Sequence, residues 1–292
     1  MSLRRTATRS LRGFVMSKKN ACFAPMFSNN VNPGTMYYHQ SITLQNTAKK
    51  EEKKKTAAVI LSGCGFLDGS DATETVSIIV ELTRKGIIPK FFSPYQEIDE
   101  SFNYITKQVD ATEERYIEKE SARITRDKVL NVDQCRADQF DMLVIPGGGG
   151  ITRNLSNFEQ EEYNIKEVEI NPNVEKIILD FFKQKKPIGF ISNSAILGAK
   201  VLGKKSGVTG SGIAVALGKT LDRTFVDTLV SKYGNELSKE VGDPDIVLTD
   251  SSHRIASVAS GTAAGTVLPH EVYSAAKNLV DELVELTKKK DE

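Results

Sequence analysis

The chain has 292 residues, of which 39% are hydrophobic and 26% are charged, a composition typical of soluble globular proteins. No uninterrupted apolar stretch approaches the roughly 18 residues that a membrane-spanning helix requires, so the sequence predicts no transmembrane segment. The three cysteines, Cys22, Cys64 and Cys135, have neither paired nor metal-type spacing. We therefore expect no disulfide framework and no metal site.

The net charge of +1 conceals two different segments. Residues 1–50 contain eight Lys and Arg and no Asp or Glu, so the other 242 residues together carry −7. A basic, acid-free N-terminus that can form an amphipathic helix is typical of a mitochondrial presequence. We predict a presequence and disordered basic linker over residues 1–55, followed by a single domain over 56–292 in the mitochondrial matrix or facing it. The alternative is a basic tail that binds anionic surfaces.

From residue 57 onwards, short apolar runs alternate with segments that repeat apolar residues at helical spacing. In chain order we expect a strand at 57–62, a helix at 73–85, strands at 87–94 and 140–150, a helix at 174–186, a strand at 187–191, a helix at 222–234, two strands joined by a turn within 245–260, and a closing helix at 268–290. The segment 95–135 is interpreted as an insertion of strands and a short helix over one edge.

Strands that are apolar throughout and alternate with helices indicate a parallel sheet that is covered on both faces. The predicted fold is therefore a doubly wound, mostly parallel, flavodoxin-like α/β sandwich. In such a fold, ligands bind beyond the carboxyl ends of the strands.

One of these strand ends leads almost directly into a helix. In "KKPIGFISNSAILGAK", residues 185–200, Ser192 occupies the corner between the two. A tight strand-to-helix turn holds its apical side chain in a strained backbone conformation near the N–H groups of the helix, and enzymes often place a nucleophile there. Ser192 is therefore a candidate site residue.

Four segments together resemble one family. They are "ILSGCGFLDGSDATE" at 60–74, "ESARITRDKV" at 120–129, "DMLVIPGGGGITRNLSNF" at 141–158 and "KPIGFISNSAILGAKVL" at 186–202. Together they resemble the bacterial ElbB protein and its mitochondrial homologues, a branch of the class I glutamine amidotransferase-like superfamily of PfpI type. The resemblance implies the glutamine amidotransferase-like fold and a pocket in which an elbow cysteine, assisted by a glutamate, supports glyoxalase-like, peptidase or chaperone activity.

The sequence departs from this family pattern around the expected pocket. Ser192 stands where the family has the elbow cysteine, whereas Glu74, twelve residues before Gly86, matches the helper glutamate. Gly149 stands where the branch usually has an aromatic residue, and "ASVASGTA" replaces the expected "TTPA" near the C-terminal pair of strands. The nucleophile of the family is therefore missing.

A serine hydroxyl needs an adjacent base, itself oriented by a third group, before it attacks a substrate. None of the three histidines is expected in that role, because His39 lies in the predicted presequence, His253 in the predicted turn and His270 at the start of the last helix. Glu74 alone is a poor base for an alcohol. Ser192 is thus either a nucleophile or a structural serine that satisfies backbone groups at the turn.

Two other features remain as candidates. Cys64, at the end of the first strand, is either a displaced thiol nucleophile or an inert buried residue. The glycine run, with Gly148 and Gly149, is expected to form the pocket backbone together with Asn193. It could also cradle a phosphate, although it lacks the P-loop lysine and the dinucleotide-binding spacing.

Two functions of different classes follow. The first is a catalytically degenerate ElbB-like protein that serves as a binding or scaffold subunit, either as a homo-oligomer or within a mitochondrial complex. The second is a glyoxalase-like or amidohydrolase-like enzyme that uses Ser192 or Cys64 with Glu74. We expect neither a cofactor nor a nucleic-acid partner in either case.

Overall fold

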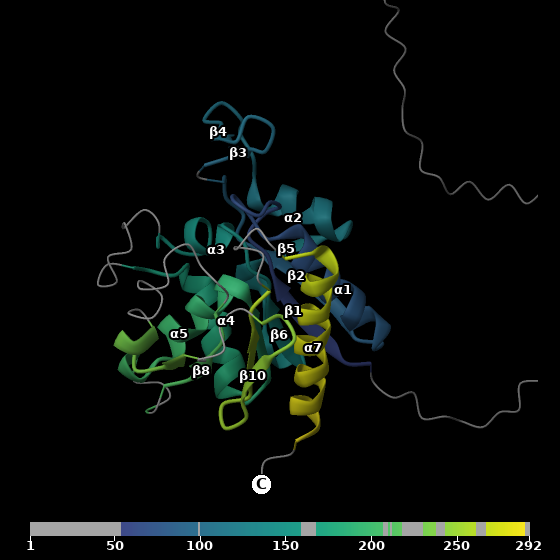
Figure 1. Cartoon of the computed structure of the whole chain (residues 1–292), viewed down its shortest axis with the longest axis vertical. Coiled ribbons are helices and arrows are strands. Elements are labelled where there is room, and N and C mark those ends of the chain that lie inside the picture. The colour runs from purple at the N-terminus through teal and green to yellow at the C-terminus, as the bar shows by residue number, and fades with distance from the viewer. Residues whose placement is uncertain are drawn as a thin grey trace, which may run out of the picture. The chain divides into compact units, whose positions relative to one another are not determined.

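Figure 1 shows the computed structural model of the chain, which describes residues 54–98, 100–158, 168–206, 210, 212–217, 230–237, 243–260 and 267–289. The chain divides into two units, Met1–Lys50 and Glu51–Glu292. The predicted presequence and most of the helix predicted at 222–234 lie outside the described residues.

A seven-stranded sheet forms the centre of the second unit, in the order β10-β11-β7-β6-β1-β2-β5. Every neighbouring pair is parallel except β10 and β11, which are antiparallel. The strands are β1 (Thr56–Ile60), β2 (Ile88–Ser93), β5 (Val129–Asn131), β6 (Met142–Ile145), β7 (Ile188–Ile191), β10 (Val247–Asp250) and β11 (Ile255–Val258). The mostly parallel α/β fold expected from the sequence is confirmed.

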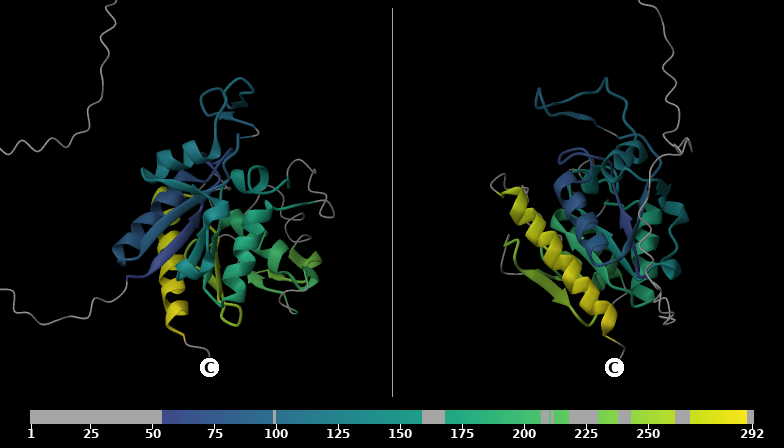
Figure 2. Two further views of the ribbon diagram at one scale, coloured as in Figure 1. Left: turned by 180° about the vertical axis from the view of Figure 1, so that it is seen from behind. Right: turned by 90° about the vertical axis from the view of Figure 1, so that its right-hand side faces the viewer.

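Helices cover both faces of this sheet (Figures 1 and 2). The pair α1 (Ala72–Arg84) and α7 (Pro269–Lys288) packs together on one face. The helices α4 (Pro172–Lys183) and α5 (Ala195–Leu202) cover the other. Of the helices in the part of the chain that the structure describes, none is long and apolar enough to cross a membrane.

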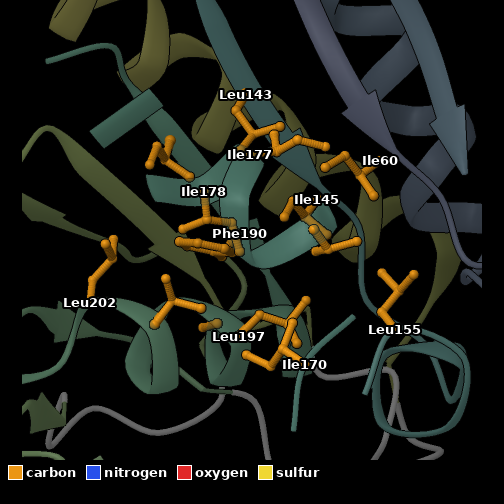
Figure 3. Close-up of a cluster of buried hydrophobic side chains, with 14 of the residues drawn as sticks. Ile60, Leu143, Ile145, Leu155, Ile170, Ile177, Ile178, Phe190, Leu197 and Leu202 are labelled. Atoms are coloured by element: carbon orange, nitrogen blue, oxygen red, sulfur yellow. The ribbon is translucent and has the colours of Figure 1, made fainter. Parts of the chain in front are cut away.

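The central strands β6 and β7 are apolar throughout because both of their faces are buried, whereas β2 is exposed over its first half, which contains Lys90. Along β1, Ala58 and Ile60 face the cluster under α4 and α5, whereas Ala57 and Val59 face the cluster under α1 and α7. Figure 3 shows the first cluster, in which Ile60, Leu143, Ile145 and Phe190 come from the strands and Ile177, Ile178, Leu197 and Leu202 come from the helices.

The segment 95–135 contains the expected strands and short helix, but its last strand lies elsewhere than predicted. The short hairpin of β3 (Phe102–Asn103) and β4 (Gln108–Val109) forms a separate two-stranded sheet, and α2 (Ile117–Thr125) follows it. The strand β5 pairs with β2 and becomes the edge of the main sheet. This part of the segment is therefore sheet and not only a covering insertion.

Three further small elements lie outside the main sheet and the helices that cover it. The four-residue helix α3 (Gly150–Arg153) follows the glycine run after β6. The strands β8 (Ala214–Val215) and β9 (Glu236–Leu237) form a second two-stranded sheet. The amide N–H of Ala216, just after β8, donates to Ser257 Oγ of β11 at 2.8 Å, so this small sheet is attached beside the antiparallel edge.

Candidate active-site elbow

The elbow between β7 and α5 is a strained turn built without a loop. A short 3₁₀ turn, Ser192–Ser194, joins the strand directly to the helix. Ser192 has φ of +58° and is 5% exposed, a left-handed conformation that costs a non-glycine residue about 1–2 kcal/mol. Ser194 holds the turn, because its Oγ donates to Ile145 O at 2.7 Å and accepts from Ile191 N at 3.0 Å.

Gly147 lies at the point where the site side chains converge. A Cβ on this residue would lie 2.7 Å from Asn193 Oδ1, 2.8 Å from Ser192 Cβ and 2.9 Å from Glu74 Oε2. Real Cβ atoms do not approach other atoms so closely. The absence of a side chain at Gly147 is therefore what allows Ser192, Asn193 and Glu74 to meet.

Glu74 is fully buried, although it belongs to the first turn of α1. Its Oε2 accepts from Gly147 N at 2.7 Å, and its Oε1 accepts from Ser260 Oγ. The N-terminus of a helix favours a carboxylate in the first turn. Glu74 is thus a buried carboxyl at the elbow and not a solvent-facing helix residue.

The helix that carries Glu74 begins at a capped position. Asp71 is the N-cap of α1, and its Oδ1 accepts from Thr73 N at 2.8 Å and Glu74 N at 3.0 Å. Burial raises the pKa of Asp71, while these two backbone donors lower it. Its own N–H donates to Gly147 O at 2.8 Å, which ties the start of α1 to the end of β6.

The N–H groups of the glycine run are all used inside the protein. Those of Gly147, Gly148, Gly149 and Gly150 donate to Glu74 Oε2, Asn193 Oδ1, Phe66 O and Gly69 O, at 2.7–3.0 Å. The Asn193 amide returns a second hydrogen bond to Gly148 O at 2.9 Å. In this conformation the run offers no free N–H to a phosphate or to a developing oxyanion, which weakens the phosphate-cradle alternative.

Neither described histidine contacts Ser192. His253 lies in the turn before β11, which runs parallel to β7, so it sits at the sheet edge opposite the elbow. There its Nδ1 is 2.8 Å from Asp250 Oδ2. His270 is exposed in the first turn of α7. His39 lies outside the described residues, and the described part of the chain gives the Ser192 hydroxyl no hydrogen-bonded base.

Cys64 lies beside an acidic network. Arg115 bridges buried Asp68 and Glu120, with Nη1 2.6 Å from Asp68 Oδ2 and Nη2 2.7 Å from Glu120 Oε2, and it also donates to Cys64 O. Burial and the nearby Glu120 raise the pKa of the Cys64 thiol, and the positive charge of Arg115 opposes them. The thiol is therefore protonated at neutral pH, which disfavours Cys64 as a nucleophile.

Within the described residues, no group of three His, Cys, Asp or Glu side chains could hold a metal ion.

The fold brings together Glu74, Ser192 and Asn193 around Gly147. Gly148 lies beside them, bonded to Asn193, and Gly149 follows it in the glycine run. Sequence reasoning missed Ser260, which contacts Glu74 from beyond the end of β11. Its position at the carboxyl end of a strand next to β7 was the signal that could have revealed it.

Known proteins show similarity to about half of the chain in sequence and to most of it in fold. No protein-family model matches the chain. It is 35% identical over 145 residues to the mitochondrial ES1 protein homolog of Rattus norvegicus, and 34% identical over 145 residues to the human mitochondrial glutamine amidotransferase-like class 1 domain-containing protein 3. Each match covers 50% of this chain and 53% of the relative, so the matched region spans about half the length of these relatives.

A solved structure extends the similarity to the whole fold. The crystal structure of an isoprenoid biosynthesis protein with an amidotransferase-like domain from Ehrlichia chaffeensis is 29% identical, with a TM-score of 0.67, and the match covers 79% of this chain and 99% of that one. About half of the chain is thus similar in sequence to the mitochondrial ES1 proteins. Those relatives are named as mitochondrial proteins, and this chain has the amidotransferase-like α/β fold.

Proposed function

We propose that this chain is a catalytically degenerate, ElbB-like protein of mitochondria that acts as a binding or scaffold subunit of a larger assembly. The observation that carries the proposal is the lack of an activated nucleophile at the elbow between β7 and α5. Ser192 replaces a cysteine in the family pattern, and no base is hydrogen-bonded to its hydroxyl within the described residues. An unassisted hydroxyl supplies almost no nucleophile at neutral pH, whereas a thiol needs only a modest fall in its pKa.

The neighbouring groups do not compensate for this loss. Glu74 accepts hydrogen bonds on both carboxyl oxygens, from Gly147 N and from Ser260 Oγ. The Asn193 amide and the N–H of Gly148 bond each other. These hydrogen bonds of Glu74 and Asn193 go to the glycine run and to Ser260 and none of them goes to Ser192, so these groups serve the packing of the elbow in this structure.

The test is turnover of methylglyoxal by the purified chain. We expect the wild-type protein to show no more activity than Ser192→Ala, which keeps a Cβ in the same backbone conformation and removes only the hydroxyl. We also expect Ser192→Cys to gain a thiol that oxidises more readily under mild peroxide than Cys135, which is buried and has a pKa raised to about 12 by that burial. Activity that is lost in Ser192→Ala would contradict the degenerate assignment.

One observation favours the enzymatic alternative, in which Ser192 is a working nucleophile. Its left-handed backbone, at φ of +58°, is the kind of strain found at functional sites. A serine hydrolase with this elbow would hydrolyse a chromogenic ester, such as p-nitrophenyl acetate, in a reaction that Ser192→Ala abolishes. Equal rates for the two proteins would remove this alternative.

The mitochondrial part of the proposal rests on the acid-free N-terminus and on the relatives, which are named mitochondrial. We expect residues 1–50 to send a fluorescent reporter to the mitochondrial matrix, and the chain without them to stay in the cytosol. The assembly part predicts that most of the native protein migrates well above its 32.1 kDa monomer mass. A cytosolic reporter would refute the first expectation, and a purely monomeric native protein would refute the second.

A further inference from the structure

A short hairpin projects from one end of the α/β domain (Figures 1 and 2). Its strands β3 and β4 form a two-stranded sheet of their own. The tip carries Ile105, which is 93% exposed, beside Tyr104 and Val109, which are 40% and 47% exposed. Adjoining exposed apolar residues are a mark of surfaces that bind other molecules, so the hairpin is a candidate interaction element.

Hydrogen bonds hold this tip in one conformation. Asn103 Oδ1 accepts from Ile105 N at 3.0 Å and from Thr106 N at 3.1 Å. Tyr104 Oη accepts from Leu67 N at 2.7 Å, which ties the hairpin to the loop after β1. A tip that is ordered before a partner arrives loses less conformational entropy on binding.

Negative charge flanks the apolar tip. Glu113 and Glu114, a few residues after β4, are exposed, and neither forms an ion pair within the described part of the chain. Lys107 brings a positive charge to the tip, where its Nζ lies 5.7 Å from the centre of the Tyr104 ring. We call Tyr104, Ile105, Val109, Glu113 and Glu114 the hairpin surface. A matching partner offers positive charge around an apolar contact.

The opposite end of the same domain carries positive charge. It lies at the amino-terminal ends of the parallel strands, where α7 also ends (Figure 1). Arg254 Nη1 donates to Lys185 O at 3.0 Å, and its Nη2 donates to Lys289 O at 2.8 Å. Lys55 Nζ donates to Thr287 Oγ1 in the last turn of α7. These contacts place four cations, from four chain segments, around the end of α7.

Two acidic residues at this end are already engaged. Asp141 Oδ2 accepts from the first N–H of β1 at 2.7 Å, and Glu285 pairs with Lys288 at 2.6 Å. Ile88, which is 40% exposed, donates its N–H to Lys55 O at 2.9 Å, so an apolar residue lies among the cations. We call Lys54, Lys55, Ile88, Lys185, Arg254 and Lys289 the tail surface. Its charge and its apolar residue complement those of the hairpin surface.

We propose that the hairpin surface of one copy of this chain docks on the tail surface of a second copy. The two surfaces cannot meet within one copy, because the hairpin follows the carboxyl end of β2 and the tail surface lies at the amino-terminal ends of the strands. Each copy therefore presents one surface of each kind to its neighbours, and such a head-to-tail contact builds a ring or a filament. This contact rests on the proposed assembly function, and it makes a second copy the partner in that assembly.

The first test is sedimentation velocity of the purified full chain over a range of concentrations. We expect species above the 32.1 kDa monomer mass, and we expect them to dissociate at about 1 M salt, where the Debye length falls to about 3 Å. Ile105→Ser should weaken association about tenfold or more, because it removes the central apolar contact. Val76→Ser, on α1 and also exposed at 47%, is the matched control and should leave association unchanged.

The second test reverses charge at each end. The hairpin variant combines Glu113→Lys with Glu114→Lys, and the tail variant combines Lys54→Glu with Lys289→Glu. All four side chains are exposed, so both proteins should fold normally. Each variant alone should associate about tenfold more weakly than wild type, because like charges then face each other. An equal mixture should associate again, since every contact between the two variants pairs opposite charges.

A charge-matched control combines Lys204→Glu with Lys205→Glu, two exposed residues that belong to neither surface, and it should associate as wild type does. Four results would overturn the proposal: a purified chain that is monomeric at every concentration, equal losses in Ile105→Ser and Val76→Ser, equal losses in the tail variant and its control, or a mixture no stronger than its parts. The proposed mitochondrial assembly is decided separately, by the native mass in extract. A purified monomer that migrates above 32.1 kDa in extract would remove this contact and leave that assembly standing.

Discussion

Substituting Gly147 with alanine tests how the elbow is built. The added Cβ would lie 2.7–2.9 Å from atoms of Asn193, Ser192 and Glu74, which come from two different parts of the chain. None of these side chains can retreat freely, because Glu74 is fully buried and Asn193 is bonded to Gly148 in both directions. The substitution must therefore displace groups that hold the site together.

The expected loss of stability has two parts. Inserting a methyl group into a packed site costs about 1–3 kcal/mol. Displacing Glu74 and Asn193 weakens their hydrogen bonds to the glycine run, at about 1 kcal/mol for each bond lost. We therefore expect Gly147→Ala to lower the free energy of unfolding by about 2–5 kcal/mol, summing these contributions.

Gly86→Ala is a suitable control, because Gly86 has φ of +72° but nothing within 4 Å of an added Cβ. This variant should lose only the conformational cost of about 1–2 kcal/mol. Urea denaturation monitored by circular dichroism measures both losses. If Gly147→Ala proves no less stable than Gly86→Ala, the close approach of Ser192, Asn193 and Glu74 to Gly147 does not exclude a side chain at this position.

Three further predictions concern charged and titratable groups. Arg115→Met leaves buried Asp68 without its ion-pair partner and Glu120 with only the exposed Arg123, so it should cost about 3–5 kcal/mol in urea denaturation. Arg123→Met removes only this exposed partner and should cost under about 1 kcal/mol. Equal losses would contradict the importance of the buried network around Arg115. Burial raises the pKa of Cys64, so peptide mass spectrometry should show slower iodoacetamide alkylation of Cys64 in the folded protein than of a free thiol at pH 8; rapid alkylation at pH 7 would show a reactive cysteine. Burial raises the pKa of Asp250, but hydrogen bonds from Ser252, His253 and Ala214 N outweigh it and lower the pKa. Ionised Asp250 therefore stabilises the fold above the unfolded pKa of about 3.9, and this contribution is lost as pH falls through the lower folded pKa. Asp250→Asn should be less stable than wild type at pH 6, with a gap that narrows in acid, and a gap that is constant with pH would refute this account.

Much of the central sheet could be predicted from local pattern. The runs that became β1, β6 and β7 are almost continuously apolar, because helices cover both faces of these strands. The change to an antiparallel pair at β10 and β11 was also predicted, since two short strands flank the polar turn "DSSH". The elbow at Ser192 followed from the absence of any loop between strand and helix.

Other features could not be read from local pattern. The three residues of β5 are too few to show a period, and their place at the sheet edge depends on pairing with β2, more than 30 residues earlier. Helical spacing leaves Glu74 equally able to face solvent or pocket. Only the approach of Gly147 and Ser260, from 73 and 186 residues away, makes it a buried carboxyl.

The sequence by itself determined the layered arrangement of a central sheet between helices. A strand that is buried on two faces must be apolar, and a helix that packs on a sheet must repeat apolar residues at helical spacing. The sequence also determined the chemistry available at the elbow, since a serine there lacks the acidity of a thiol whatever surrounds it. The tertiary structure alone decided how the polar groups are satisfied. The hydrogen bonds of the glycine run, the acidic network around Arg115 and the bonds of Arg254 to Lys185 and Lys289 all depend on which distant segments meet, and hydrogen bonds are directional and short-ranged, so residue order does not reveal them.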